Sequence, residues 1–317
     1  MKTDFSPFFI VGAPRCGTTA MSRYLGKHPN ICFSDPKETH YFLFADHAKG
    51  SDALRKEFLS AYFPNLSDVT RVVGDGSIST LYSKDALQLI LRVFEAPKFI
   101  VMLRNPVDML RSYHARVLHL RQENEADLET AWAIQDQRAK GVRIPKSCSD
   151  PRVLQYRDIA RLGFHSAQMV ETVGAENCLP LFFDDFMSDT LGTYQKTLEF
   201  LDLPYDGRAK FRRKNAARTY KNGFLQSLYS GPVMRPVANQ FMKNPVRAAR
   251  IQRALRPYRK KMKKANSLEA NPASLDPVFA AELRDYFAED VRELGQLFGR
   301  DLEHWTKADP VGVAPAV

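Results

Sequence analysis

A short loop near the amino terminus has the residues needed to hold an anion. The apolar segment 8–11 precedes Gly12-Ala13-Pro14-Arg15-Cys16-Gly17-Thr18-Thr19, and a helix-like segment, 18–26, follows. Glycines let backbone N–H groups approach an anion, and the amino end of a helix adds positive potential. A nucleotide-kinase loop would carry lysine where Thr18 stands, whereas the cation here is Arg15. The spacing therefore predicts a phosphate- or sulfate-binding loop and disfavours ATP chemistry; a plain strand-to-helix turn is the alternative.

A second pair of anion-binding side chains follows another apolar segment. Residues 98–103 predict a buried strand, Asn105-Pro106 predicts the start of a helix, and Arg104 lies between them. Ser112 comes about two helical turns later. Ligands of open α/β sheets bind at the carboxyl ends of strands, where arginine can take a phosphate bidentately. Taken alone, Arg104 and Ser112 would suggest a surface ion pair and a solvated serine. Because the same chain also contains the first loop, they predict a second phosphate-binding site.

Both segments resemble the signature segments of sulfotransferases that use 3′-phosphoadenosine 5′-phosphosulfate (PAPS). Residues 8–19 are similar to the loop that grips the 5′-phosphosulfate in that family, although lysine is common where Arg15 stands. Residues 99–114 are similar to the strand and helix that bind the 3′-phosphate. Shorter likenesses occur at 74–82, 181–186, 212–218 and 294–305, so the resemblance runs from about residue 7 to 305.

The resemblance implies a donor site built from three of these segments. The first loop and the second strand–helix unit supply most of it, and 212–218 stands where the family has a basic loop over the 3′-phosphate. The implied donor-binding residues are Arg15, Cys16, Gly17, Thr18, Thr19, Arg104, Ser112, Arg213 and Lys214. PAPS is the expected donor and 3′-phosphoadenosine 5′-phosphate (PAP) the product. We expect no metal requirement, because a sulfuryl group carries less negative charge than a phosphoryl group.

A further segment, Lys37-Glu38-Thr39-His40-Tyr41-Phe42, resembles the K-E-x-H-F-F element of the bacterial and glycan-type branch of sulfotransferases. The resemblance implies that Glu38 is the base and that His40 assists or contacts substrate. Lys37 and Arg15 are then expected to balance charge near the leaving oxygen. His114 is a competing base, because the cytosolic small-molecule branch uses a histidine. An exposed Lys–Glu pair and a structural histidine are the plain alternatives.

The implied reaction is the in-line transfer of a sulfuryl group to a hydroxyl of a sugar, lipid or small metabolite, with an amine as second choice. The segments 42–62 and 123–150 are expected to line the acceptor pocket, and the acceptor itself stays unidentified. Two other classes remain open. A P-loop kinase for nucleotides or small molecules is disfavoured by Thr18, and a non-catalytic nucleotide-binding or membrane-associated adaptor is disfavoured by Glu38.

The elements that must position these residues alternate between strands and helices. Apolar runs at 8–11, 98–103 and 178–183 predict strands, while 18–26, the segment after Asn105, 191–201 and 275–298 predict helices. This alternation predicts an α/β, P-loop-like three-layer fold with a central, mostly parallel sheet flanked by helices. We expect one sulfotransferase domain over residues 1–308 and a flexible tail over 309–317.

Composition excludes several classes of protein. The 317 residues are 44% hydrophobic, which excludes wholesale disorder. No apolar run of about 18 residues predicts a membrane span, and the apolar run at 8–11 is too short for a signal-peptide core. The four cysteines lack C-x-x-C spacing, so we expect free thiols and no zinc. The chain is expected to be cytoplasmic, with peripheral membrane contact as an option; its oligomeric state is left open.

The net charge of +10 comes from one segment. Residues 243–264 contain ten Lys and Arg and no acidic residue; taking these ten from the total of 46 leaves 36, equal to the 36 Asp and Glu. Ile251, Leu255, Tyr258 and Met262 form an apolar stripe in a predicted helix, interrupted by Pro257. The plain interpretation is a solvated face whose stripe packs on the body. An anionic membrane surface, or an acidic or already sulfated acceptor, is the alternative; nucleic acid is disfavoured because no recognised motif accompanies the charge.

Overall fold

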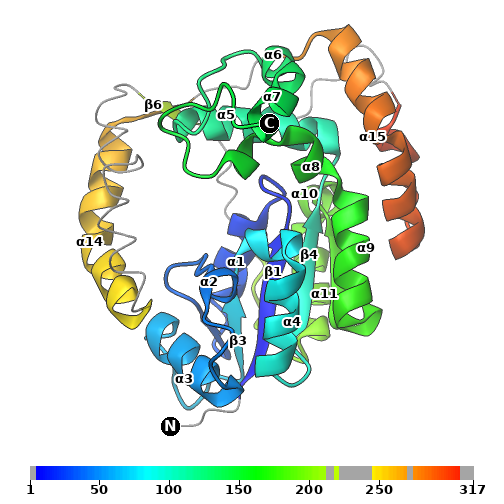
Figure 1. Ribbon diagram of the computed structural model, residues 1–317. Helices are drawn as coiled ribbons and strands as arrows, with labels where there is room; N and C mark the ends of the chain where they lie inside the picture. The colour runs from blue at the N-terminus through cyan, green and yellow to red at the C-terminus, as the bar shows by residue number, and fades with distance from the viewer. Residues whose placement is uncertain (1–4, 212–217, 221–244, 270–273, 308–317) are drawn as a thin grey trace.

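The fold centres on a five-stranded parallel sheet with helices on both sides (Figure 1). The computed structural model describes residues 5–211, 218–220, 245–269 and 274–307. The strands are β1 (Ser6–Gly12), β2 (Ile31–Phe33), β3 (Val72–Asp75), β4 (Lys98–Leu103) and β5 (Cys178–Phe182), in the order β2-β3-β1-β4-β5. The α/β fold predicted from the sequence is confirmed.

Helices connect these strands. The longer ones are α1 (Thr18–Leu25), α3 (Ser51–Tyr62), α4 (Lys84–Val93), α5 (Pro106–His119), α9 (Leu162–Val173), α11 (Thr190–Phe200), α14 (Pro245–Ala265) and α15 (Pro277–Phe298). The shorter ones are α2 (Tyr41–Phe44), α6 (Leu128–Ala133), α7 (Gln135–Ala139), α8 (Tyr156–Ala160) and α10 (Phe183–Ser188). Single 3₁₀ turns are η1 (Ile78–Tyr82), η2 (Pro151–Leu154), η3 (Ala175–Asn177) and η5 (Glu303–Trp305).

The two central strands are apolar because both of their faces are covered. Phe99 to Leu103 of β4 are all buried, and so are the last six residues of β1. Strands of parallel sheets read as continuous apolar runs for this reason. A separate antiparallel pair, β6 (Arg218–Tyr220) with β7 (Ser267–Glu269), was not predicted, because a three-residue strand has no distinctive period.

The order of the strands creates a switch point beside β1. The chain runs from β1 to β2 and β3 on one side, and then returns to place β4 and β5 on the other. In open α/β sheets, ligands bind beyond the carboxyl ends of the strands at such a point. The loop after β1 and the residues after β4 lie there, since Gly12 is in register with Met102.

The carboxyl-terminal helix α15 is attached to the body through a carboxylate. Asp290 accepts hydrogen bonds from the backbone N–H groups of Gly163 and Phe164 at 2.8 and 2.9 Å, and so caps the amino end of α9. A Cβ atom on Gly163 would lie 2.2 Å from the Asp290 carbonyl oxygen, so the close approach requires glycine. Beyond α15, the Trp305 indole donates to Asp184 at 2.7 Å, next to the end of β5.

The basic helix α14 differs from its prediction in two ways. It runs through Pro257 as one helix of 21 residues, without the predicted interruption. The predicted apolar stripe is only partly covered by the body: Ile251 is half-buried, while Leu255, Tyr258 and Met262 are exposed. In Figure 1, α14 lies along one side of the molecule, away from the sheet and beside α3. The tail 309–317 falls outside the described residues.

Candidate active site

The loop after β1 has the backbone of an anion cradle. Gly12 has φ of 125° and Gly17 has φ of 88°, conformations that favour glycine. A Cβ atom on Gly12 would lie 2.3 Å from the Met102 carbonyl oxygen, so only glycine fits beside β4. Gly17 is also the N-cap of α1, and within the described part of the chain no side chain caps this helix end. Its first N–H groups are therefore left for an anion.

The two predicted anion-binding segments meet in space. Arg15 Nε donates to Ser112 Oγ at 2.8 Å, across 97 residues of sequence, and Arg104 Nη1 donates to the Arg15 carbonyl at 3.3 Å. Because Ser112 accepts from Arg15, its own hydroxyl proton is available to a further acceptor. The loop after β1, the residue after β4 and helix α5 thus form one continuous cationic site.

Arg104 has the features of a residue built to hold an anion. Its guanidinium lies over the Phe183 ring, 4.5 Å from the centroid, and one of its terminal nitrogens is 3.7 Å from an Asp108 oxygen. Its Nε is buried and, among the residues that the structure describes, has no hydrogen-bond partner. A buried donor without a partner costs about 1–3 kcal/mol, which a bound phosphate oxygen would recover. The site therefore suits a doubly anionic ligand.

Arg116 is a member of this site that the sequence analysis missed. Burial lowers the pKa of Arg15, and the neighbouring charges of Arg116 and Arg104 lower it further. Burial also lowers the pKa of Arg116 itself, while the charge of Glu38 opposes that effect. Arg116 follows Ser112 by one turn of α5, so both lie on the same face of the helix. That spacing could have pointed to Arg116 from the sequence. Three guanidinium groups therefore share the site and repel one another without a ligand.

The segment carrying the predicted base lies against the amino end of α1. Lys37 Nζ donates to Glu38 Oε1 at 2.8 Å and to Thr18 Oγ1 at 3.3 Å. His40 Nε2 is 3.8 Å from Glu38 Oε2, and its Nδ1 is 2.7 Å from Ser79 Oγ. The Glu38 side chain is 36% exposed, so an acceptor from solvent can reach it. The structure thus brings Lys37, Glu38 and His40 to the loop that holds Thr18.

Asp75, at the end of β3, organises this segment and was not singled out by sequence. Its buried carboxylate accepts from the N–H groups of Ser77 and Thr39, at 2.8 and 3.3 Å, and from the Ser34 hydroxyl at 3.3 Å. The Gly76 N–H also donates to the Lys37 carbonyl at 2.9 Å. The resemblance of residues 74–82 to the family could have pointed to Asp75. Its hydrogen-bond partners, however, depend on how the segment 34–40 folds back onto β3.

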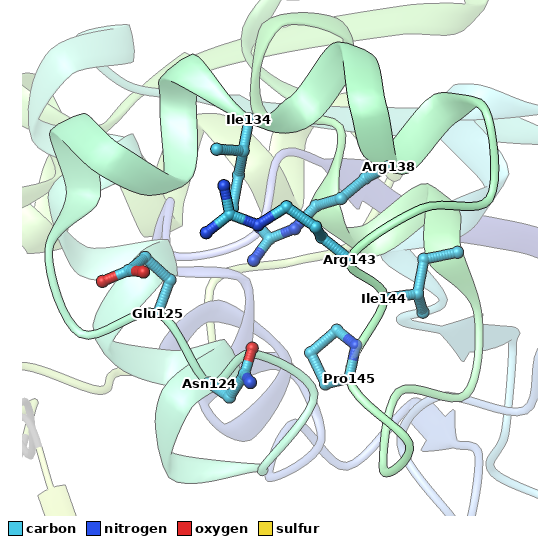
Figure 2. Close-up of a pocket in the computed structure, with 7 residues that line it drawn as sticks. All are labelled: Asn124, Glu125, Ile134, Arg138, Arg143, Ile144 and Pro145. Atoms are coloured by element: carbon cyan, nitrogen blue, oxygen red, sulfur yellow. The ribbon is translucent and has the colours of Figure 1, made fainter.

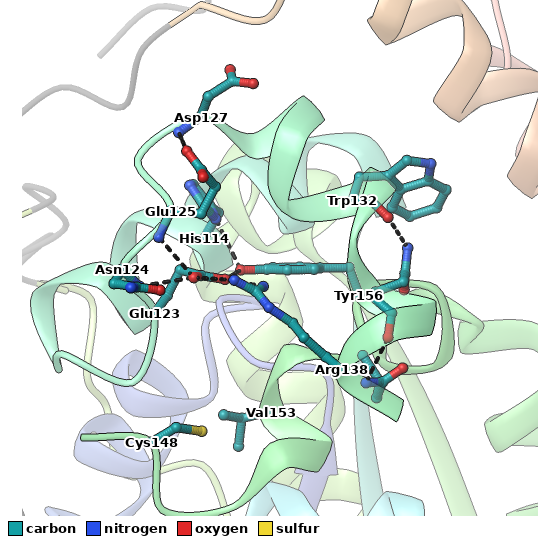
Figure 3. A network of polar contacts seen from close by, with 12 residues as sticks. His114, Glu123, Asn124, Glu125, Asp127, Trp132, Arg138, Cys148, Val153 and Tyr156 are labelled. Atoms are coloured by element: carbon teal, nitrogen blue, oxygen red, sulfur yellow. Dashed lines mark hydrogen bonds and ion pairs between the residues drawn. The ribbon is translucent and has the colours of Figure 1, made fainter. Parts of the chain in front are cut away.

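His114 does not reach the donor loop, which argues against its role as a base. Its ring is buried, with Nδ1 3.0 Å from the Tyr156 hydroxyl and Nε2 3.1 Å from the Ala126 carbonyl oxygen (Figure 3). Burial lowers its pKa. Tyr156 donates to Glu123, which also forms a bidentate ion pair with Arg138 at 2.5 and 2.6 Å. His114 therefore belongs to a buried structural network on the other side of α5 from Ser112.

The remaining predicted site residues have different outcomes. The Cys16 side chain is fully buried, and burial raises the pKa of its thiol to about 12, so only its backbone can serve the loop. Arg213 and Lys214 lie outside the described residues. All four cysteines are free thiols. In the described ranges, no group of three His, Cys, Asp or Glu side chains could hold a metal ion, and no helix is both long and apolar enough to cross a membrane.

A cavity of about 230 Å³ lies next to the His114 network, within the segment 123–150 (Figure 2). Its lining residues are Asn124, Glu125, Ile134, Arg138, Arg143, Ile144 and Pro145. Arg138, held by Glu123, joins the cavity to that network. The segment 123–150 was expected to line the acceptor pocket, and the cavity has a charged lining that suits a polar molecule.

Comparison with known proteins identifies the family. A model of the sulfotransferase family matches residues 7–207, which include every described residue of the cationic site. The chain belongs to the sulfotransferase family. The sulfotransferase fold of the chain also agrees with a crystal structure of a sulfotransferase from Alicyclobacillus acidocaldarius. That match has a TM-score of 0.65 and 20% identity, and it covers 95% of this chain and 99% of the other.

Two further similar proteins match smaller parts of this sulfotransferase. The membrane-associated sulfotransferase kil1 of Dictyostelium discoideum is 27% identical over 126 residues, which are 39% of this chain. The match spans about a quarter of that protein, 26% of its length. A crystal structure of mouse sulfotransferase SULT7A1 complexed with PAP has a TM-score of 0.40 and 16% identity, and covers 65% of this chain and 61% of that one.

Proposed function

We propose that this sulfotransferase moves a sulfuryl group from PAPS to a hydroxyl, or in second place an amine, of a sugar, lipid or small metabolite. The observation that carries the proposal is the hydrogen bond between Arg15 and Ser112, with Arg104 on the Arg15 carbonyl. It joins the two segments that resemble the family's 5′ and 3′ phosphate sites. A donor with anionic groups at both ends matches one continuous site of this kind.

The residues of the cationic site fit the two ends of such a donor. The N–H groups of Gly17, Thr18 and Thr19 and the Arg15 side chain would hold the 5′-phosphosulfate at the amino end of α1. Arg104, with its unpartnered Nε, and the Ser112 hydroxyl would hold the 3′-phosphate. PAPS, when bound, supplies the sulfuryl group. Cationic side chains and backbone N–H groups would stabilise the leaving phosphate oxygen, so no metal is invoked.

Glu38 is proposed to take the acceptor proton. Its Oε1 is engaged by Lys37, while Oε2 faces His40 at 3.8 Å. Lys37 holds the carboxylate beside Thr18 and would shift toward the bridging oxygen as charge develops there. His40 is proposed as a positioning residue, because Ser79 orients its ring toward Glu38. We include in this proposal that the chain belongs to the bacterial and glycan-type branch of sulfotransferases, which the segment 37–42 resembles.

The proposal is tested by donor binding and by group transfer. PAP is expected to raise the melting temperature of the full chain, and ATP with Mg²⁺ to raise it much less. Labelled sulfate from PAPS is expected to pass to a component of a metabolite extract. Stabilisation by ATP with Mg²⁺ alone would support the kinase alternative. PAP binding without transfer to any sugar, lipid or metabolite fraction would support the non-catalytic adaptor. A cytoplasmic location is part of the proposal, and detection of the full chain in fractionated cells would test it.

A further inference from the structure

Helix α14 is attached to the body by one of its faces. Ala249 is 1% exposed, Arg253 donates to the Ala61 carbonyl of α3 at 3.2 Å, and Arg256 pairs with Asp35 at 2.7 Å. These residues follow one another at spacings of four and three, so they form a single row along the helix. The row facing the body is therefore made of a small residue and two arginines, and it is not the apolar side of the helix.

The apolar side chains of α14 form the opposite row. Ile251, Leu255, Tyr258 and Met262 are displaced by two residues from the inner row, which is roughly 200° around the helix axis. Leu255 and Met262 are each 37% exposed and Tyr258 is 71% exposed. An amphipathic helix on the surface of a globular protein normally points its apolar stripe toward the core. Here Ile251 is half-buried and the other three side chains of the stripe are exposed, so most of the stripe is turned away from the body.

Basic side chains lie beside this outward stripe. Arg250 and Lys261 are exposed, and both lie on the same side of the stripe, roughly 60–140° from it around the helix axis. The sequence of 243–264 contains no acidic residue that could neutralise them, while the rest of the chain has equal numbers of acidic and basic residues. The occupant of this face must therefore have negative charge and also an apolar part.

We propose that the outer face of α14 binds an anionic phospholipid bilayer. A helix with exposed Tyr, Leu and Met beside a row of basic side chains has the chemistry of a helix lying in the membrane interface, where apolar groups reach the acyl boundary and cations meet the headgroups. A soluble polyanion such as a sulfated polysaccharide would use the basic side chains but would leave Leu255, Tyr258 and Met262 in water. The combination of both features favours the bilayer.

The same helix contacts the segment of the candidate base. Arg256 pairs with Asp35, which precedes Lys37 and Glu38 in the chain by two and three residues. Binding through the outer row leaves this inner contact intact, so the bilayer would lie on the side of α14 opposite to the base segment. The lipid contact does not rest on sulfotransfer, and the two proposals can fail separately.

Sedimentation with vesicles tests the proposal on the full chain. Vesicles of phosphatidylcholine alone are compared with vesicles containing roughly one third phosphatidylserine, at low and at high salt. The apolar variant is Leu255→Gln with Tyr258→Ser, and the basic variant is Arg250→Gln with Lys261→Gln. The matched controls are Val69→Ser with Val278→Ser, which are exposed apolar positions elsewhere, and Lys84→Gln with Lys140→Gln, which are exposed lysines elsewhere.

The expected result is binding to the phosphatidylserine vesicles that weakens with salt. The basic variant is expected to bind more than ten-fold more weakly, at about five-fold per cation removed. The apolar variant should lose about ten-fold, and both control pairs should bind as the unmodified chain does. Unchanged melting temperature and unchanged stabilisation by PAP would show that all variants are folded.

Three outcomes would overturn the proposal. They are no sedimentation with phosphatidylserine vesicles, equal losses in the control pairs, and binding that the apolar variant leaves unchanged. Heparin is included as a soluble polyanion. Tight heparin binding that depends only on Arg250 and Lys261, without vesicle binding, would assign the face to an acidic ligand and not to lipid.

Discussion

Arg15 has a strained backbone that its contacts hold in place. Its φ of 72° is left-handed, which costs a non-glycine residue roughly 1–2 kcal/mol. The side chain bonded to Ser112 and the carbonyl bonded to Arg104 keep that conformation. Strain of this kind collects at ligand sites, where the surrounding structure determines it. At this scale the site is an arrangement of single side chains around α1 and α5, and single substitutions test it.

Replacement of Glu38 by glutamine tests the base. Glu38→Gln keeps the shape of the side chain but cannot take a proton, so turnover with PAPS and an acceptor is expected to fall about 10²–10⁴-fold. The dissociation constant for PAP should stay within about two-fold, because Glu38 faces the acceptor. Glu95→Gln, at an exposed position, is the control and should leave both quantities unchanged. Full turnover by Glu38→Gln would remove Glu38 from the mechanism.

Replacement of Arg116 tests whether the third guanidinium serves the site. Its charge acts on both Arg15 and Glu38. Arg116→Gln is expected to weaken PAP binding and turnover by about ten-fold each, since one cation near a partly buried anion is worth of order 1–2 kcal/mol. Arg292→Gln, which breaks an exposed pair with Glu289 on α15, should change both by less than two-fold. Equal effects of the two variants would mean that Arg116 does not serve the site.

At the scale of elements, a buried ion pair ties the segment after α5 to α7 and α8. Glu123 accepts from Arg138, from two backbone N–H groups and from Tyr156. Burial by itself would raise the pKa of Glu123, but the hydrogen bonds from Arg138, the Glu125 backbone and Tyr156 lower it overall. The network fixes the loops around the cavity of Figure 2 and so determines the shape of that cavity.

Removal of one partner from this ion pair should be costly. Arg138→Met leaves the Glu123 carboxylate buried without its cation, and the free energy of unfolding is expected to fall by about 3–5 kcal/mol. Arg152→Gln breaks an exposed pair with Asp150 and should cost less than about 1 kcal/mol. Urea denaturation of the full chain measures both. A loss below about 1 kcal/mol for Arg138→Met would show that the network contributes little.

At the scale of the whole molecule, the candidate donor site and the segment that carries the net positive charge lie in different places. The switch point of the sheet concentrates Arg15, Arg104 and Arg116 in a body with balanced charge, while residues 243–264, most of them in α14, carry the excess positive charge. Donor binding therefore depends on local placement, whereas any attraction to an anionic surface depends on α14. Salt should weaken the attraction of α14 to an anionic surface more than it weakens donor binding, because exposed charges are screened more strongly than partly buried ones.

The stability of the molecule should fall in mild acid because of His114. Its pKa is lowered in the folded state, so the unfolded chain binds a proton near pH 6.5 while the folded chain does not. Unfolding thus takes up a proton below about pH 6.5, and the free energy of unfolding decreases between about pH 7 and 5. His114→Gln should reduce that slope, whereas His47→Gln, at an exposed position, should not. The same slope in both variants would contradict this account.

Local sequence determined the strands β1, β4 and β5, the start of α5 and the anion loop of this sulfotransferase, while the short strands β2 and β3 were not predicted. Apolar runs with helices between them predicted the parallel sheet, and Asn105-Pro106 begins α5 as expected, with Asn105 accepting from the Val107 N–H at 3.0 Å. The glycines at 12 and 17 predicted a loop that only glycine can form. Apolar runs, a capping Asn-Pro pair and glycine spacing are patterns of neighbouring residues, and that is why residue types are enough to predict them, although the close approach of Gly12 to Met102 is a contact between distant segments.

Tertiary structure decided the contacts between distant segments. The bond from Arg15 to Ser112, the position of Arg116 near Glu38 and the burial of His114 away from the donor loop all depend on how α5 lies across the end of the sheet. The stripe on α14 shows the same limit: its spacing predicted an apolar row, but not that Ala249, Arg253 and Arg256 would face the body. A helical period fixes which side chains share a face. Only the packing of the rest of the chain determines which face is covered.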